Sequence, residues 1–278
     1  MLFTINEAAS PIIFRAARYK NPRLDHHLYP GTVFDFDIKI VRSFDEFCSH
    51  VSSPKEAMIS FIMNGVGYEA AVKKRTMYWP EILMSKKEGN CFDFGVFMHF
   101  FFQKKGIEHA LGFSLNLGRS SALPIPGHCF PVFRSPIDGN LWIWNYFAPK
   151  QGDINGPFET YEEIADEAGS YFSILYNSEN YAGPIASHPR EARIPLTTIV
   201  REEELQIIDQ AYSIKDVRLQ DEISGSLPSV QRMQMQFMDY RDALLKGSPL
   251  RRVVELFWPN PAERSIQSMF REFFKNGK

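Results

Sequence analysis

The sequence is poor in cysteine, and its few cysteines are not paired. Only Cys48, Cys91 and Cys129 occur among the 278 residues, and no two of them are spaced as CxxC. Three thiols cannot make the disulfide framework of a small secreted domain, and a zinc-binding spacing is missing. We therefore expect reduced thiols in a cytosol-like compartment, with no metal and no cofactor.

The sequence also lacks an excess of charge and long apolar runs. Lysine and arginine number 31 against 33 aspartates and glutamates, a formal net charge of −2, so no basic field attracts a nucleic-acid backbone. No stretch contains the roughly 18 apolar residues of a membrane-spanning helix, and residues 1–27 do not resemble a signal peptide. These absences predict a cytoplasmic protein that binds neither nucleic acid nor membrane.

The residue patterns that are present indicate both strands and helices, with no internal repeats. Apolar residues with strand or helix periodicity occur in several runs: strand-like at 32–41, 108–118, 127–135 and 140–148, and helix-like at 43–63, after Asn90, and at 156–176. The pattern predicts an α+β fold in which a cysteine-bearing helix packs on an antiparallel sheet. We expect a core domain at 1–185 and a helical C-terminal extension at 186–278.

The stretch GNCFDFGVFMHFF places Cys91 at the predicted start of a helix. Asn90 is a good N-cap, and Asp93 stands at the third helical position, where it completes a capping box. Unpaired amides and the positive end of the helix dipole favour a thiolate at the first helical position. This placement indicates a nucleophile with a lowered pKa, whereas Cys48 and Cys129 are predicted to be core residues.

A nucleophilic thiol needs a proton carrier, and His128 is the better of two candidates. His99 lies eight residues after Cys91 on the same predicted helix, about 12 Å along its axis and out of hydrogen-bonding range. His128 opens the strand-like run GHCFPVF. If residues 134–139 form the loop of a hairpin, Asn145 stands directly opposite His128 and can orient the imidazole; any loop of even length keeps the two on one face.

These features together resemble the transglutaminase-like superfamily of cysteine enzymes, which are relatives of the papain-like fold. The resemblance rests on YWPEILMSKKEGNCFDFGVFMHFFFQKKGIEHALGF, GHCFPVFRSPIDGNLWIWNYF and GPFETYEEI, within residues 60–165. It implies that Cys91 begins the central helix, that Gly106-Ile107 follows its end, and that His128 and Asn145 complete the triad. The family usually has aspartate as the third member, whereas asparagine is found in papain-like proteases.

Acyl chemistry on Cys91 also needs an oxyanion hole. We expect it to combine the Cys91 backbone N–H with one donor from an upstream side chain, and the sequence offers both Tyr68 and Trp79. The predicted function is a thiol hydrolase, a peptidase or amidase that acts on a peptide or protein substrate through a thioester. Transfer to an amine, which cross-links proteins, would use the same residues.

Other functions stay open at this point. A catalytically weak or inactive protein could use the same fold, with its C-terminal helices binding a protein partner in a larger bacterial or phage particle. Arylamine N-acetyltransferases also use a cysteine nucleophile with a histidine base. That family has Arg-Gly-Gly before the cysteine, whereas this chain has Lys87-Glu88-Gly89-Asn90. The stretch GVGYEA at 65–70 satisfies a dinucleotide-binding pattern without the alternating strands and helices that should follow it.

Overall fold

The computed structural model describes residues 12–20, 35–68, 76–116, 125–146, 152–166, 197–214 and 220–245. The helices are α1 (Phe44–His50), α2 (Pro54–Asn64), α3 (Pro80–Lys86), α4 (Cys91–Lys105), α6 (Glu202–Ser213), α7 (Gln220–Ser224) and α8 (Pro228–Leu245). The strands are β1 (Phe14–Tyr19), β2 (Phe36–Val41), β3 (Gly67–Tyr68), β4 (Glu88–Gly89), β5 (His109–Asn116), β6 (Ile125–Arg134), β7 (Leu141–Tyr146), β8 (Gly152–Phe158) and β9 (Thr197–Arg201). Helices together with an antiparallel sheet confirm the predicted α+β class.

The chain divides into two compact units. Unit 1 comprises residues 1–112, 129–161 and 200–223, and unit 2 comprises 113–128, 162–199 and 224–278. The division falls inside β6, between His128 and Cys129. Unit 1 therefore contains Cys91, Tyr68 and Asn145, and unit 2 contains His128.

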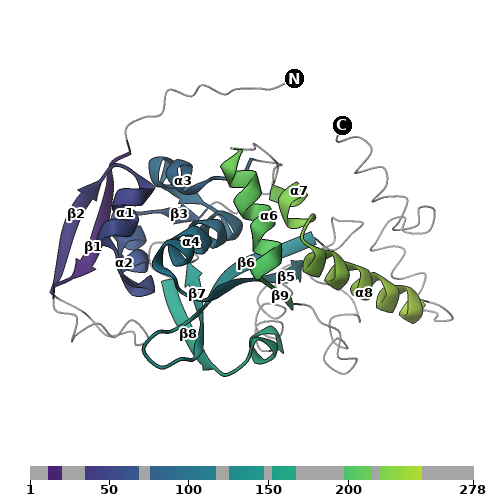
Figure 1. Ribbon diagram of the computed structural model, residues 1–278. Coiled ribbons are helices and arrows are strands. Elements are labelled where there is room, and N and C mark those ends of the chain that lie inside the picture. The colour runs from purple at the N-terminus through teal and green to yellow at the C-terminus, as the bar shows by residue number, and fades with distance from the viewer. Residues whose placement is uncertain are drawn as a thin grey trace, which may run out of the picture. The chain divides into compact units, whose positions relative to one another are not determined.

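The core of unit 1 is built around α4, which lies among α1, α2 and α3 (Figure 1). Every residue of α4 from Phe92 to Phe102 is buried, so the helix is enclosed on all sides, as expected of a central helix. Phe97 meets the rings of Phe44, Phe47 and Phe61 edge to face, at centroid distances of 4.9 to 5.3 Å. Aromatic packing on several sides thus fixes the axis of the helix that carries Cys91.

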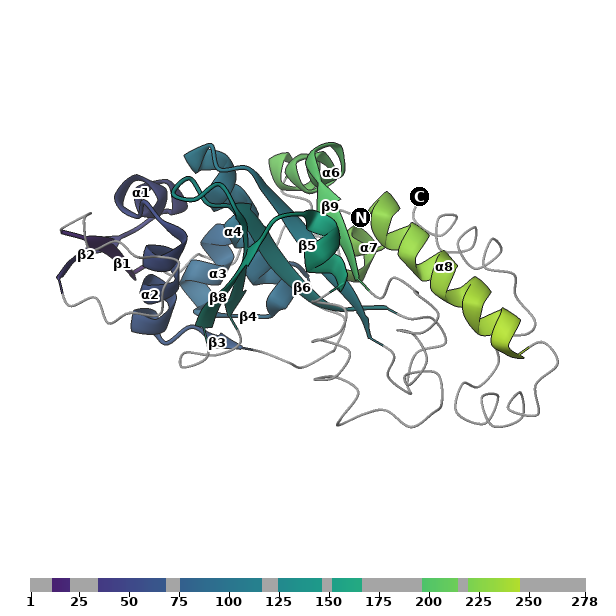
Figure 2. The same ribbon diagram turned by 90° about the horizontal axis from the view of Figure 1, so that it is seen from below.

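A hairpin of β1 and β2 lies on the far side of α1 and α2 from α4 (Figure 2). The outward amides of β1 are bonded by side chains of α2. Arg15 N–H donates to Asn64 Oδ1 at 2.9 Å, and Ala17 N–H donates to Ser60 Oγ at 2.8 Å. Tyr19 N–H donates to Glu56 Oε1 at 2.6 Å. Three side chains spaced by four residues on one helix face thereby replace a neighbouring strand.

The five-stranded sheet has the order β8-β7-β6-β5-β9. In the hairpin of β6 and β7, Arg134 pairs with Leu141 and Val132 with Ile143, so the loop is 135–140. The predicted loop, 134–139, is wrong by one residue, which moves the register by two. Continued along the strands, the observed register puts Asn145 opposite Phe130 instead of His128.

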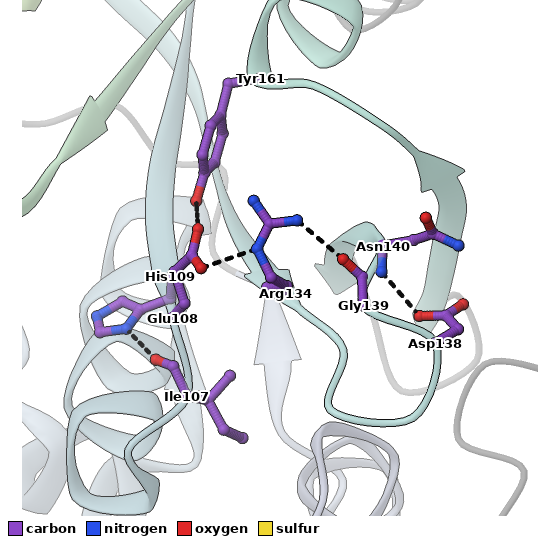
Figure 3. A network of polar contacts seen from close by, with 8 residues as sticks. All are labelled: Ile107, Glu108, His109, Arg134, Asp138, Gly139, Asn140 and Tyr161. Carbon is purple, nitrogen blue, oxygen red and sulfur yellow. Dashed lines mark hydrogen bonds and ion pairs between the residues drawn. The ribbon is translucent and has the colours of Figure 1, made fainter.

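A polar network fixes this hairpin to the start of β5 (Figure 3). Arg134 Nε donates to Glu108 Oε2 at 2.8 Å, and its Nη1 donates to the Gly139 carbonyl at 2.8 Å. The Tyr161 hydroxyl donates to the other Glu108 oxygen at 3.1 Å. The bond from Arg134, followed by that from Tyr161, holds the pKa of Glu108 below its ordinary value. One arginine therefore connects the hairpin loop to the strand on its other side.

Replacing Glu108 with glutamine is expected to lower the free energy of unfolding by about 1 kcal/mol or less at pH 7, because both partners of the ion pair reach solvent. The depressed pKa makes this contribution present at neutral pH and lost as the pH falls through the carboxyl's ordinary value of 4.5 and below. Urea unfolding of Glu108→Gln, with Asp37→Asn on the exposed strand β2 as control, measures it. A loss above about 2 kcal/mol would contradict a surface network.

Part of the segment predicted as a helical extension joins the sheet instead. Within 186–278, the strand β9 lies beside β5, and α6 belongs to unit 1, where the Tyr212 hydroxyl donates to Glu81 of α3 at 2.8 Å. In unit 2, the hydroxyls of Ser114 and Thr197 are 2.9 Å apart, and α8 buries Val230, Met233 and Met238. No helix in the described ranges is both long and apolar enough to cross a membrane.

Candidate active site

Cys91 is the first residue of α4, as the sequence predicts. The Asn90 side chain accepts from the amides of Phe92 and Asp93, at 3.0 and 3.2 Å. In return, Asp93 Oδ2 accepts from the Asn90 amide at 2.9 Å, and its other oxygen accepts from the Tyr78 amide at 2.9 Å. The predicted capping box is confirmed. The buried carboxylate of Asp93 also ties the helix start to the segment before α3.

A pair of two-residue strands brings Tyr68 to Cys91. Strand β3 pairs in parallel with β4, and Tyr68 aligns with Gly89, two residues before the cysteine. The Tyr68 ring contacts Phe94, one turn into α4, at a centroid distance of 6.1 Å. Its hydroxyl hydrogen-bonds the Cys91 sulfur.

Two backbone amides also bond the sulfur, those of Cys129 on β6 and of Phe92. Burial is nevertheless the largest influence, and it raises the pKa of the Cys91 thiol above its ordinary value, with the nearby Asp93 charge acting in the same direction. The prediction of a lowered pKa is therefore wrong, because desolvation outweighs the donors. Cys91 rests as a thiol and needs a base in order to attack.

Of the two upstream donors, only Tyr68 contacts the sulfur in this structure. Trp79 precedes α3, is buried, and packs against Phe100 and Tyr212 at centroid distances of 6.4 and 5.2 Å. Phe100 stands nine residues after Cys91, which is about 13 Å along the helix axis. The tryptophan ring thus belongs to the packing of α3, α4 and α6.

His128 and Asn145 are both buried, with 2% and 5% of their surface exposed. His128 directly precedes Cys129, whose amide bonds the Cys91 sulfur. Asn145 lies on β7 in unit 1, where its neighbours Trp144 and Tyr146 pack on Phe61. The structure therefore brings together Cys91, Tyr68 and the Cys129 amide. The His128 ring is not among the groups that hydrogen-bond the sulfur.

A second polar cluster lies near the other end of α4. His99, which the sequence excluded as the partner of Cys91, has its Nδ1 2.8 Å from His109 Nε2 and its Nε2 2.9 Å from Asp209 Oδ1. His109 Nδ1 is 2.8 Å from the Ile107 carbonyl. Among the described residues, this cluster and every other group of histidines, cysteines and carboxylates lack the arrangement to hold a metal ion.

The other cysteines are buried free thiols, as predicted. Burial raises the pKa of Cys48 to about 12 and that of Cys129 well above its ordinary value. Both therefore serve as internal controls for the reactivity of Cys91, which is partly exposed.

The chain was compared with known proteins by sequence. It matches no protein-family model, and a search of curated proteins finds no significant match.

Proposed function

We propose that the protein is a cysteine hydrolase of the transglutaminase-like class, which cleaves peptide or amide bonds through a thioester on Cys91. The observation that supports this most is the placement of the sulfur at the tip of a rigid, buried helix. There it meets three hydrogen-bond donors: the Tyr68 hydroxyl and the amides of Phe92 and Cys129. A core cysteine needs no such set of donors, whereas a sulfur that gains negative charge does.

In the proposed reaction, His128 takes the thiol proton as Cys91 attacks the substrate carbonyl, which requires the imidazole to reach the sulfur from the face of β6 opposite to the Cys129 thiol. Asn145 is on that same face, and it orients the imidazole from a diagonal position in the register. The carbon–sulfur bond forms, the carbonyl becomes an oxyanion, and collapse breaks the carbon–nitrogen bond while His128 returns the proton to the leaving amine. Water, deprotonated by His128, then releases the acid and restores the thiol. Because the resting pKa of Cys91 is raised, proton transfer accompanies attack.

Tyr68 is the side chain that we assign to the oxyanion. Its hydroxyl bonds the sulfur in the resting site, and the oxyanion forms on the carbon that becomes bonded to that sulfur. The Cys91 backbone N–H, which is unpaired within the first turn of a helix, is the second donor. Transfer to a primary amine would proceed through the same thioester, so the two outcomes differ only in the second nucleophile.

The test is the pH dependence of iodoacetamide labelling at each cysteine, followed by peptide mass spectrometry. We expect Cys91 to be labelled at least about tenfold more slowly in His128→Ala than in the wild type at pH values below the labelling midpoint, because the thiol then lacks the base that removes its proton during attack. His50→Ala, at the end of α1, is the matched control and should leave the rate unchanged. Equal rates in the wild type and His128→Ala would favour the non-catalytic, assembly function of the fold.

A second experiment separates hydrolysis from amine transfer. The protein is treated with p-nitrophenyl acetate, and the acetyl adduct on Cys91 is followed by mass spectrometry with and without a primary amine. Decay at the same rate in both conditions indicates a hydrolase. Faster decay with formation of the acetylated amine indicates a transferase, and the absence of any adduct on Cys91 would contradict both.

A further inference from the structure

Gly95 stands in the middle of the helix that carries Cys91, where glycine is unfavourable. A glycine in a helix interior costs about 1 kcal/mol relative to alanine. The positive φ angles found at Gly65 and Gly106 do not extend to Gly95, so the backbone conformation does not require a glycine. The reason must lie in the space that a side chain would occupy.

That space is filled by Cys129 of β6. A Cβ atom at position 95 would stand 2.7 Å from Cys129 Sγ, a separation that real Cβ contacts do not show, but 3.9 Å from Cys129 Cβ, an ordinary contact. Cys91 and Gly95 are one turn apart on the same helix face. Cys129 therefore spans one turn of α4, with its amide on the Cys91 sulfur and its thiol on Gly95.

A second glycine, Gly112, leaves room for Phe130, which follows Cys129 on β6. A Cβ atom at Gly112 of β5 would stand 2.2 Å from the ring of Phe130, which is fully buried. Successive residues of a strand point to opposite faces, so Cys129 is seated on α4 and Phe130 on β5. The two glycines set how closely β6 approaches the helix immediately after His128.

We propose that Gly95 is a positioning residue for Cys91: by admitting the Cys129 thiol, it lets β6 approach until the Cys129 amide bonds the sulfur. This inference deepens the proposed function and rests on it for its catalytic meaning. A side chain at position 95 pushes β6 away, removes the amide donor and makes the thiolate harder to form. His128, covalently joined to Cys129, moves with the strand.

The test is the labelling midpoint of Cys91 in Gly95→Ala, Cys129→Ala and the double variant. Gly95→Ala is expected to raise the labelling midpoint by about one pH unit, because a hydrogen-bond donor to the charged sulfur is lost. At pH values well below the midpoint, labelling of Cys91 should then be about tenfold slower. In the double variant the clashing sulfur is gone, and the contacts that remain, with Leu111 Cδ2 at 3.6 Å and the Cβ of residue 129 at 3.9 Å, are ordinary. Its midpoint should return to that of Cys129→Ala.

A graded series keeps the test decisive if Gly95→Ala alone does not fold. Gly95→Ala is then combined with Cys129→Ser, whose oxygen lies closer to its own Cβ than sulfur does, and a smaller shift is expected. An unchanged midpoint in Gly95→Ala, or a shift that Cys129→Ala does not reverse, overturns the proposal. If Gly95 behaves as expected but His128→Ala has no effect on labelling, the positioning role stands and the proposed hydrolase fails.

Discussion

Replacing Asp93 with alanine is expected to lower the free energy of unfolding by about 3 kcal/mol. The carboxylate is fully buried and accepts from the amides of Asn90 and Tyr78, both at 2.9 Å. Without it, two amides inside the protein lose their acceptor, and each costs about 1 to 3 kcal/mol. Equilibrium urea unfolding measures the loss.

Asp45 provides the matched control, because it is also an aspartate in the first turn of a helix. Its side chain is 79% exposed and pairs with Lys104 at the surface, so Asp45→Ala should cost less than about 1 kcal/mol. Equal losses for the two variants would contradict the role of Asp93 in tying α4 to the segment before α3.

Asp93 stabilises the fold, but it makes the Cys91 thiolate harder to form. Its charge raises the pKa of Cys91, so the isosteric Asp93→Asn should lower the labelling midpoint while it destabilises the fold. Stability and thiol reactivity thus move in opposite directions in one variant. A general loss of structure would instead expose all three cysteines, and labelling of Cys48 and Cys129 would reveal it.

Acidification between pH 6.5 and 4 is expected to remove about 3 kcal/mol of stability through His109. Burial, followed by the nearby His99, lowers the pKa of His109 from 6.5 to about 4. Between pH 6.5 and 4, His109 therefore binds a proton in the unfolded chain but not in the folded chain. The contribution is complete above pH 6.5 and is lost as the pH falls toward the folded value, at about 1.4 kcal/mol for each pH unit that separates the unfolded and folded pKa values.

The hydrogen bonds explain why His109 resists protonation. Its Nδ1–H donates to the Ile107 carbonyl (Figure 3), which leaves Nε2 to accept from His99 Nδ1. The other nitrogen of His99 lies 2.9 Å from Asp209 Oδ1. A proton on His109 Nε2 would remove the acceptor and place two donors face to face.

The measurement is the difference in unfolding free energy between the wild type and His109→Gln at several pH values. Carboxylates elsewhere in the protein titrate in the same pH range, but they contribute equally to both proteins and cancel in the difference. The difference should shrink steadily from pH 6.5 to pH 4. Parallel curves for the wild type and His109→Gln would contradict this role of His109.

The local geometry around Cys91 could be predicted from sequence because it depends on neighbouring residues. Asn90 and Asp93 form the capping box that their spacing predicts, and α1 and α2 occupy the helix-like run at 43–63, with α2 ending one residue beyond it. The strands β1 and β8 were missed. β1 is stabilised by side chains of α2 more than 35 residues away, which no local pattern reveals.

The rest of the site depends on contacts between distant segments. Tyr68 reaches Cys91 through the pairing of β3 with β4, and the Cys129 amide arrives 38 positions further along the chain. The rise in the pKa of Cys91 follows from burial, which the sequence does not give. One local signal was available, since a glycine inside an aromatic helix indicates that another segment approaches closely.

The covering of β1 by α2 has a consequence for aggregation. An exposed strand edge is a template on which another chain can add a strand. The amides of Arg15, Ala17 and Tyr19 are already bonded to side chains of α2, so β1 cannot recruit a neighbour. Chain-to-chain pairing through this hairpin is restricted to the outer edge of β2, where Asp37 and Lys39 place charges of both signs on exposed positions.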